Sequence, residues 1–429
     1  MKRRLLLRGG RVVDPSQGID AGRDLLIEDG KVVRLGKDLP AAGAEVVEVD
    51  GLVVVPGVID GRVSRGEPGF EHRETLVSGL AAAAAGGYAA VVAVGDTDPP
   101  VDHRAVVESL MRSAEALGGP RLYPMATITK GLAGTELAEI GELSEAGAVA
   151  VSDAGRPIRN AALLRRALLY ARHFDLPVLH RACDPDLDDR GVMHEGAWST
   201  RLGLPGRPAI SEEATVARDL LLVSETGGRY HLSPVTLAGS LERVRQARAR
   251  GLAVTCDVTP HHLLLTDEEV AASGFSTATR LDPPLRPRAD VDALLAGLAD
   301  GTIDAIVSDH RPYHADEKED VQFSIAPPGA VGLETTVSLC LDRLVHAGVV
   351  DLPRCIELLS TAPARLFGLP GGNLRPGSPA DVTLLDLDRE VTIDPSTFRS
   401  LGRSTPFAGQ TLRGAAVGVF VGGRRVELD

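Results

Sequence analysis

Eight apolar runs of strand length alternate with amphipathic helical stretches through the middle of this 429-residue chain. Continuous apolar runs are typical of a parallel sheet that is buried on both faces. Eight strand–helix units predict an α/β fold of the TIM (β/α)8 barrel type, with a closing helix near 332–347. In chain order the runs are VVVPGVID, YAAVVAVGD, RLYPMATIT, AVAVSD, LPVLHRA, RYHLS, LAVTCDVT and DAIVSD.

Both ends of the chain differ from this middle part. Residues 4–55 form short apolar or alternating runs between turn residues, and Asp29-Gly30 is a good hairpin signal. The C-terminal runs PADVTLLDLD and GAAVGVFVGGRRVEL have the same character. We therefore predict a small composite β-sandwich domain built from residues 1–55 and 373–429, with the barrel over residues 56–372.

Composition and charge disfavour several classes of protein. A net charge of -13 argues against nucleic acid and anionic membranes as partners. No apolar run approaches a membrane span, and the three leucines near the N-terminus are too few for a signal peptide. The four cysteines form no C-x-x-C pair, so we expect buried, reduced thiols in a cytoplasmic protein.

Polar residues at the ends of the eight predicted strands form the candidate site, because barrel enzymes place their chemistry there. Asp153, His180 and Asp309 are the residue types that bind metals. Other chemistries find no support, since the chain has no G-x-S-x-G, P-loop or H-E-x-x-H motif. The remaining strand-end residues include Arg62, Ser64, Asp96, Thr129, His231, Pro234, His261 and His262.

Nine ordered motifs make the chain resemble the dihydroorotase family of the amidohydrolase superfamily over nearly its whole length. The motifs are EPGFEH (67–72), AAAAGGY (82–88), DTDPPVD (96–102), VSDAGRP (151–157), GVMHEG (191–196), TPHHLLLT (259–266), DPPLR (282–286), GTIDAIVSDH (301–310) and GRSTPFAG (402–409). The resemblance implies an enzyme that hydrolyses or closes a cyclic amide. In that family one or two zinc ions activate a water, and an aspartate after the eighth strand transfers the proton.

Several positions depart from the pattern that this resemblance implies. The family's metal-binding histidines fall on Arg62, Ser64 and Pro234. Its carboxylate-binding arginine falls on Gly66, and its two substrate-binding asparagines fall on Asp96 and Asp282. A permanent cation at position 62 would repel a metal dication by roughly several kcal/mol in a partly buried site. The two added carboxylates are expected to make the pocket more anionic, although the substrate is itself a carboxylate.

The remaining metal-ligand residues also have structural alternatives. Asp153 and Asp309 could pair with arginines in an ion network, the candidates being Arg62, Arg181 and Arg311. His180 is favoured as a core histidine with satisfied hydrogen bonds. His261 and His262 are expected to cap and pack the segment after the seventh strand.

The leading hypothesis from the sequence is a dihydroorotase-like pseudoenzyme. The closest resemblance is to the non-catalytic dihydroorotase-like chain of bacterial aspartate carbamoyltransferase, on RGGRVVDPSQGID (8–20), TKGLAGTELAE (129–139) and the altered site. It implies a chain that supports assembly of the aspartate carbamoyltransferase catalytic chain in pyrimidine biosynthesis. It also implies an oligomer without a cofactor, in which Asp309 is an idle remnant of the general base.

The alternative is an active dihydroorotase that interconverts dihydroorotate and N-carbamoyl-aspartate. It would hold zinc in a reduced site at Asp153, His180 and Asp309. A third hypothesis is a binding module for another ligand at the barrel mouth.

Overall fold

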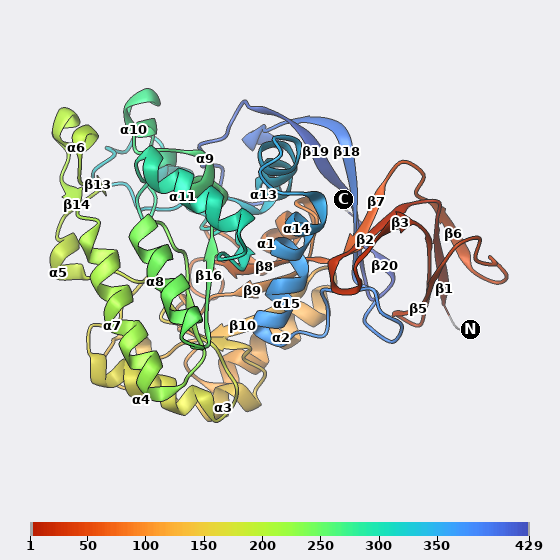
Figure 1. The fold of residues 1–429 in the computed structure, drawn as a ribbon, viewed down its shortest axis with the longest axis horizontal. Coiled ribbons are helices and arrows are strands. Elements are labelled where there is room, and N and C mark those ends of the chain that lie inside the picture. The colour runs from red at the N-terminus through yellow and green to blue at the C-terminus, as the bar shows by residue number, and fades with distance from the viewer. Residues whose placement is uncertain (1–2, 428–429) are drawn as a thin grey trace.

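The computed structural model describes residues 3–427, and its centre is a parallel eight-stranded barrel (Figure 1). Neighbouring strands pair in the order β8-β9-β10-β11-β12-β15-β16-β17, and a parallel bridge between Val63 and His310 joins the two ends. The predicted barrel is therefore confirmed, except that the first half of the run VVVPGVID, Val53–Pro56, belongs to the terminal β-domain and the first barrel strand begins at Val58. The strands are β8 (Val58–Val63), β9 (Tyr88–Ala93), β10 (Arg121–Ala126), β11 (Ala150–Val151), β12 (Val178–His180), β15 (Tyr230–Leu232), β16 (Val254–Val258) and β17 (Ala305–Ile306).

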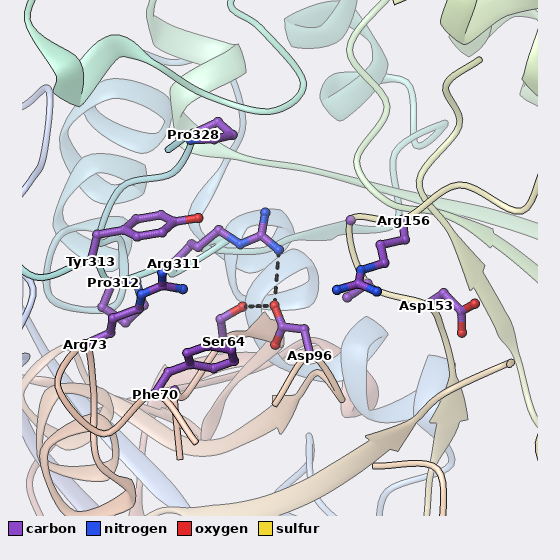
Figure 2. A pocket seen from close by; sticks show the side chains of 13 residues that line it. Ser64, Phe70, Arg73, Asp96, Asp153, Arg156, Arg311, Pro312, Tyr313 and Pro328 are labelled. Carbon is purple, nitrogen blue, oxygen red and sulfur yellow. Dashed lines mark hydrogen bonds and ion pairs between the residues drawn. The ribbon is translucent and has the colours of Figure 1, made fainter. Parts of the chain in front are cut away.

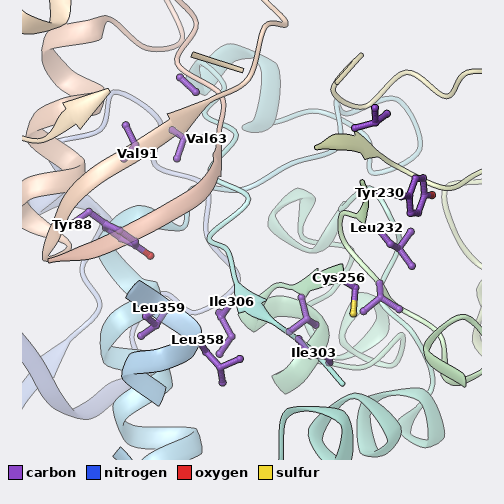
Figure 3. Close-up of a cluster of buried hydrophobic side chains, with 14 of the residues drawn as sticks. Val63, Tyr88, Val91, Tyr230, Leu232, Cys256, Ile303, Ile306, Leu358 and Leu359 are labelled. Carbon is purple, nitrogen blue, oxygen red and sulfur yellow. The ribbon is translucent and has the colours of Figure 1, made fainter. Parts of the chain in front are cut away.

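One helix follows each barrel strand and packs outside it. In order these are α1 (Leu76–Ala85), α2 (Arg104–Leu117), α3 (Ile140–Glu145), α4 (Ala161–Arg172), α7 (Ile210–Thr226), α8 (Ala238–Ala249), α11 (Arg288–Ala299) and α13 (Leu333–Cys340). Their apolar faces and the strands share one buried core, which includes Val91, Tyr230 and Ile306 (Figure 3). Removing these side chains from water is the main term that stabilises the barrel.

The long connections after β12, β16 and β17 carry short additional elements. These are α5 (Pro185–Asp188), β13 (Met193–His194), α6 (Ala197–Leu202), β14 (Gly206–Arg207), α9 (Pro260–Leu264), α10 (Glu269–Ala272) and α12 (Ala315–Lys318). They follow the C-terminal ends of the strands, so they surround the mouth of the barrel. No helix of residues 3–427 has the length and apolar character needed to cross a bilayer.

The end of the barrel differs from the expected single closing helix. After α13 the chain continues through a π-helical segment, Leu341–His346, into α14 (Leu352–Ile356), a second π-helical segment (Glu357–Thr361) and α15 (Ala362–Phe367). Asp351 starts α14 by accepting a hydrogen bond from the Arg354 backbone N–H at 2.8 Å. Leu358 and Leu359 then pack into the barrel core (Figure 3), which explains why this segment is helical.

Both chain termini build the second domain, as predicted. One sheet has the order β5 (Lys31–Gly36), β4 (Asp24–Glu28), β1 (Arg4–Arg8) and β6 (Glu45–Glu48). The other has the order β20 (Arg424–Arg425), β19 (Thr411–Val421), β18 (Val382–Thr392), β7 (Val53–Pro56), β2 (Arg11–Asp14) and β3 (Ile19–Gly22). Leu7 and Ile27 of the first sheet share a core with Val54 and Phe420 of the second.

A single residue, Gly57, links β7 of this sandwich to β8 of the barrel. A Cβ atom there would lie 2.5 Å from the Cβ of Ala89, so the close approach requires glycine. The exact domain limits stay a prediction, and residues 1–2 and 428–429, which those limits include, lie outside the described part. The four cysteines are unpaired and buried, as expected.

Candidate active site

A cavity of about 340 Å³ opens at the C-terminal ends of the barrel strands (Figure 2). It brings together residues that follow β8, β9, β11 and β17, as the strand-end argument predicted. Four predicted site residues, Ser64, Gly66, Asp96 and Asp153, lie in its wall beside arginines that the sequence did not single out as ligand-binding. The charged and polar side chains of the wall are Ser64, Arg73, Asp96, Asp153, Arg156, Arg311 and Tyr313.

Arg62 lies on β8 and is only 6% exposed. Its Nε pairs with Asp309 Oδ1 at 3.0 Å, and its Nη1 donates to the Ser233 carbonyl at 2.6 Å. Ser233 directly precedes Pro234, so the guanidinium group joins the end of β8 to the residues after β15 and β17. A fixed cation therefore lies among three strand ends at the bottom of the mouth.

Asp309 is held in an uncommon conformation next to this cation. Its φ of 47° lies in the left-handed region, which non-glycine residues rarely adopt and which often marks functional sites. Burial raises the pKa of Asp309 above its ordinary value, although Arg62 and Arg311 oppose that rise. A carboxylate with a raised pKa is a stronger base than an ordinary aspartate, which suits it to accept a proton at the barrel mouth.

Asp153 is bound by the backbone rather than by an arginine. Its Oδ1 accepts from the backbone N–H groups of Ile128 at 2.8 Å and Thr129 at 2.9 Å, and its Oδ2 accepts from the Thr129 hydroxyl. The carboxylate points away from Asp96 and Arg311 (Figure 2). Asp153 therefore fixes the segment after β10, and the arginine partner considered for it is not what the structure shows.

His180 uses both ring nitrogens inside the protein. Its Nε2 accepts from the Ile158 backbone N–H at 2.9 Å, and its Nδ1 donates to Asp219 Oδ2 at 2.7 Å. Asp219 also accepts from the Tyr230 hydroxyl at 2.9 Å. Asp219 was not predicted as a site residue from the sequence. It lies four positions after Thr215 on the buried face of α7, and an acidic residue on a buried helix face is a recognisable signal of a paired, buried charge.

These contacts bear on the zinc that the family resemblance implies. Across residues 3–427, no group of three or more His, Cys, Asp or Glu side chains is arranged to hold a metal ion. His180 has no free nitrogen lone pair, and Asp309 is paired with the Arg62 cation. Zinc needs several unprotonated donors around one point, so the residues as arranged do not fit a zinc ion.

The two added carboxylates do not give the cavity wall a net negative charge. Asp96 Oδ2 accepts from Arg311 Nη2 at 3.1 Å and from Ser64 Oγ at 3.0 Å. Away from the cavity wall, Asp282 pairs with Arg181 and Arg207. Burial opposes ionisation of Asp282, but the two arginines hold its pKa well below its ordinary value. The cavity wall itself carries three arginines against two aspartates, because the structure adds cations that the sequence comparison did not consider.

Gly66 cannot be replaced by a larger residue without a change of the backbone. Its φ is +74°, and an added Cβ would lie 2.5 Å from the Glu74 carbonyl oxygen and 2.7 Å from that of Phe70. A side chain from this position therefore cannot supply a cation to the cavity.

His261 and His262 are structural residues in this fold, as expected. Thr259 caps α9, its hydroxyl lies 2.8 Å from His262 Nδ1, and His262 Nε2 donates to the Pro283 carbonyl at 3.0 Å. Burial lowers the pKa of His262 to about 3 and that of His261 to about 4.

This burial predicts a loss of stability in mild acid. Below pH 6.5 His262 binds a proton in the unfolded chain, whereas in the folded chain it stays neutral down to about pH 3. The free energy of unfolding therefore falls as the pH decreases. Between pH 7.5 and 5, the free energy of unfolding of the wild type should fall by up to about 2 kcal/mol more than that of His262→Gln. Urea unfolding at both pH values measures this, with the exposed His173→Gln as the matched control. Equal losses in all three proteins would contradict the prediction.

The composite sandwich and the polar barrel mouth define the class of protein as an amidohydrolase-type barrel. The structure of L-hydantoinase (dihydropyrimidinase) from Arthrobacter aurescens matches with a TM-score of 0.88 and 26% identity, over 99% of this chain and 96% of that one. Dihydropyrimidinase from Brevibacillus agri NCHU1002 has the same fold, with a TM-score of 0.84 and 23% identity over 99% and 95% of the two chains.

Sequence relatives narrow this class to one family. A family model described as dihydro-orotase-like matches residues 51–238. A protein named dihydroorotase from Pelotomaculum thermopropionicum is 48% identical over 426 residues, covering 99% of both chains. Another from Anaeromyxobacter dehalogenans is 49% identical, covering 99% of this chain and 98% of the relative. The chain therefore belongs to the dihydroorotase-like family.

These relatives overturn the leading hypothesis from the sequence. Full-length relatives that bear an enzyme's name contradict both the pseudoenzyme assignment and the expectation of a non-enzyme. The expectation that no cofactor is needed gains no support from such relatives either. Altered ligand positions do not by themselves mean a lost site. Arg62 pairs with Asp309, and Ser64 and Asp96 bond to each other in the wall of an open, charged cavity.

Proposed function

We propose that this chain catalyses the dihydroorotase reaction, in which the cyclic amide dihydroorotate and its ring-opened product N-carbamoyl-aspartate interconvert. The observation that carries the proposal is the 48–49% identity, over 426 residues, to proteins named dihydroorotase. The cavity of about 340 Å³ supports it, because this volume suits a small six-membered ring.

Asp309 supports the proposal as the group that transfers the proton. Hydrolysis forms a bond between a water oxygen and the amide carbon, breaks the C–N bond of the ring, and moves a proton from the water to the departing nitrogen. A carboxylate accepts that proton and returns it to the nitrogen, and its raised pKa strengthens it as the base in the first transfer. Arg62 holds Asp309 in position through its Nε contact at 3.0 Å.

The test is an assay of the purified full chain in both directions. Dihydroorotate and N-carbamoyl-aspartate are each supplied, and the appearance of the other is followed by chromatography. Parallel samples are supplemented with zinc or treated with a chelator, because the residues as arranged do not fit the ion. We expect turnover in at least one direction. No turnover in either direction, in any sample, would overturn the proposal.

Association with the aspartate carbamoyltransferase catalytic chain stays a prediction from the sequence resemblance. The oligomeric state stays a prediction as well.

A further inference from the structure

The cavity wall contains three arginines, and one of them is held in place by a carboxylate. Arg73 forms two hydrogen bonds with Glu317, and its guanidinium lies 4.9 Å from the ring centre of Phe70 and 4.8 Å from that of Tyr313. Its charge is therefore paired, and both aromatic rings pack against it. Arg156 and Arg311 remain to be explained.

The side chain of Arg311 lies against two glycines, Gly155 beside its guanidinium and Gly329 beside its aliphatic stem. A Cβ on Gly155 would lie 3.3 Å from Arg311 Nη2, and one on Gly329 would lie 2.9 Å from Arg311 Cδ. In the part of the chain that the structure describes, Asp96 is the one hydrogen-bond partner of this guanidinium. The other N–H donors of Arg311 are available to a ligand in the cavity.

Arg156 approaches from the opposite side of the cavity. Its exposed side chain donates to the Leu132 carbonyl at 3.2 Å, and it has no carboxylate partner among residues 3–427. Figure 2 shows the guanidinium groups of Arg156 and Arg311 on either side of Asp96. Two arginines with unused donors thus border one space, and a planar anion is the ligand that such groups recognise best.

We propose that Arg311 and Arg156 bind the substrate's carboxylate, so that the chain acts on cyclic amides that carry a carboxylate rather than on neutral rings. This inference rests on the proposed dihydroorotase reaction. The two arginines reach the cavity from the loops after the fourth and eighth strands. They supply the positive charge that Gly66 cannot, because no side chain fits at that position.

The binding of orotate tests the inference without requiring turnover. Uracil is the matched control ligand, because it has the same ring without the carboxylate. Calorimetry should show that the wild-type chain binds orotate more tightly than uracil. Arg311→Met and Arg156→Met should each raise the Kd for orotate by roughly 10- to 100-fold, because each loses a charged hydrogen bond. Neither variant should change the Kd for uracil. Arg159→Met is the matched control, since Arg159 lies on the same loop and pairs with Asp186 instead.

Asp96→Asn provides a test in the opposite direction. It removes the carboxylate that competes for Arg311, so orotate should bind more tightly than to the wild type. Arg156 is exposed, so its variant keeps the test valid even if Arg311→Met fails to fold. Orotate binding unchanged in Arg156→Met, or equal binding of orotate and uracil, would overturn the inference.

The two proposals fail in different ways. If the arginine variants lose orotate but no sample turns over dihydroorotate, the proposed reaction is wrong and the carboxylate site stands. If the wild type turns over dihydroorotate while both variants bind orotate normally, the carboxylate site is wrong and the reaction stands.

Discussion

Asp309→Asn is expected to lower kcat for dihydroorotate by roughly 100- to 10,000-fold, the usual contribution of a general base. The asparagine keeps the size of the side chain but cannot accept the proton from water. In the wild type, kcat should fall as pH decreases through the raised pKa of Asp309, since only the ionised carboxylate is a base. The measurement is kcat as a function of pH, with KM determined in the same assays.

A matched control separates loss of the base from loss of a buried ion pair. Asp381 pairs with Arg121 at 2.7 Å, and Arg121 begins β10 at the end of the barrel opposite the mouth. Asp381→Asn should therefore cost stability without lowering kcat. A similar fall of kcat in both variants, or an unchanged kcat in Asp309→Asn, would show that Asp309 is not the base.

Arg62→Met is expected to lower the free energy of unfolding by about 2–3 kcal/mol, because it leaves the carboxylate of Asp309, which is 23% exposed, without its paired cation. It also removes the donor to the Ser233 carbonyl. Arg62→Lys should lose less stability than Arg62→Met, since lysine keeps the charge but not the planar arrangement of donors. Urea unfolding at pH 7 measures all three proteins.

The exposed pair of Arg165 and Glu225 supplies the control for this prediction. Arg165→Met should cost far less stability than Arg62→Met, because solvent screens surface ion pairs. Adding Asp309→Asn to Arg62→Met should recover part of the loss, because the unpaired charge is then absent. If Arg62→Met were no less stable than Arg165→Met, the buried pair would not stabilise the fold.

Much of the fold was predictable from periodicity alone. Continuous apolar runs located all eight barrel strands, and the all-β character of both ends located the composite sandwich. Helices α14 and α15 were not predicted. Their hydrophobic residues do not recur with a regular helical period, and these residues are buried because they pack under the barrel. Leu358 and Leu359 lie in the barrel core, yet they belong to a π-helical segment that interrupts the ordinary period.

The candidate site was predictable in position but not in function. Ser64, Asp96 and Asp153 do line the mouth, as strand ends in a parallel barrel must. The inference of lost catalysis, which rested on several altered positions together, is contradicted by the full-length relatives named dihydroorotase. Arg156 and Tyr313 were overlooked as wall residues, since nothing in their local sequence distinguishes a loop residue facing a cavity from one facing solvent.

The order of residues along the chain was enough to predict eight strand–helix units that form a barrel with polar residues at its mouth. Local hydrophobic period and turn residues carry that information, and they act over a few positions along the chain. Which charges meet, by contrast, depends on the folded chain. Arg311 bonds to Asp96 across 215 positions, and Arg181 to Asp282 across 101. Electrostatic pairing depends on distance in space and on burial, and neither is set until the barrel closes.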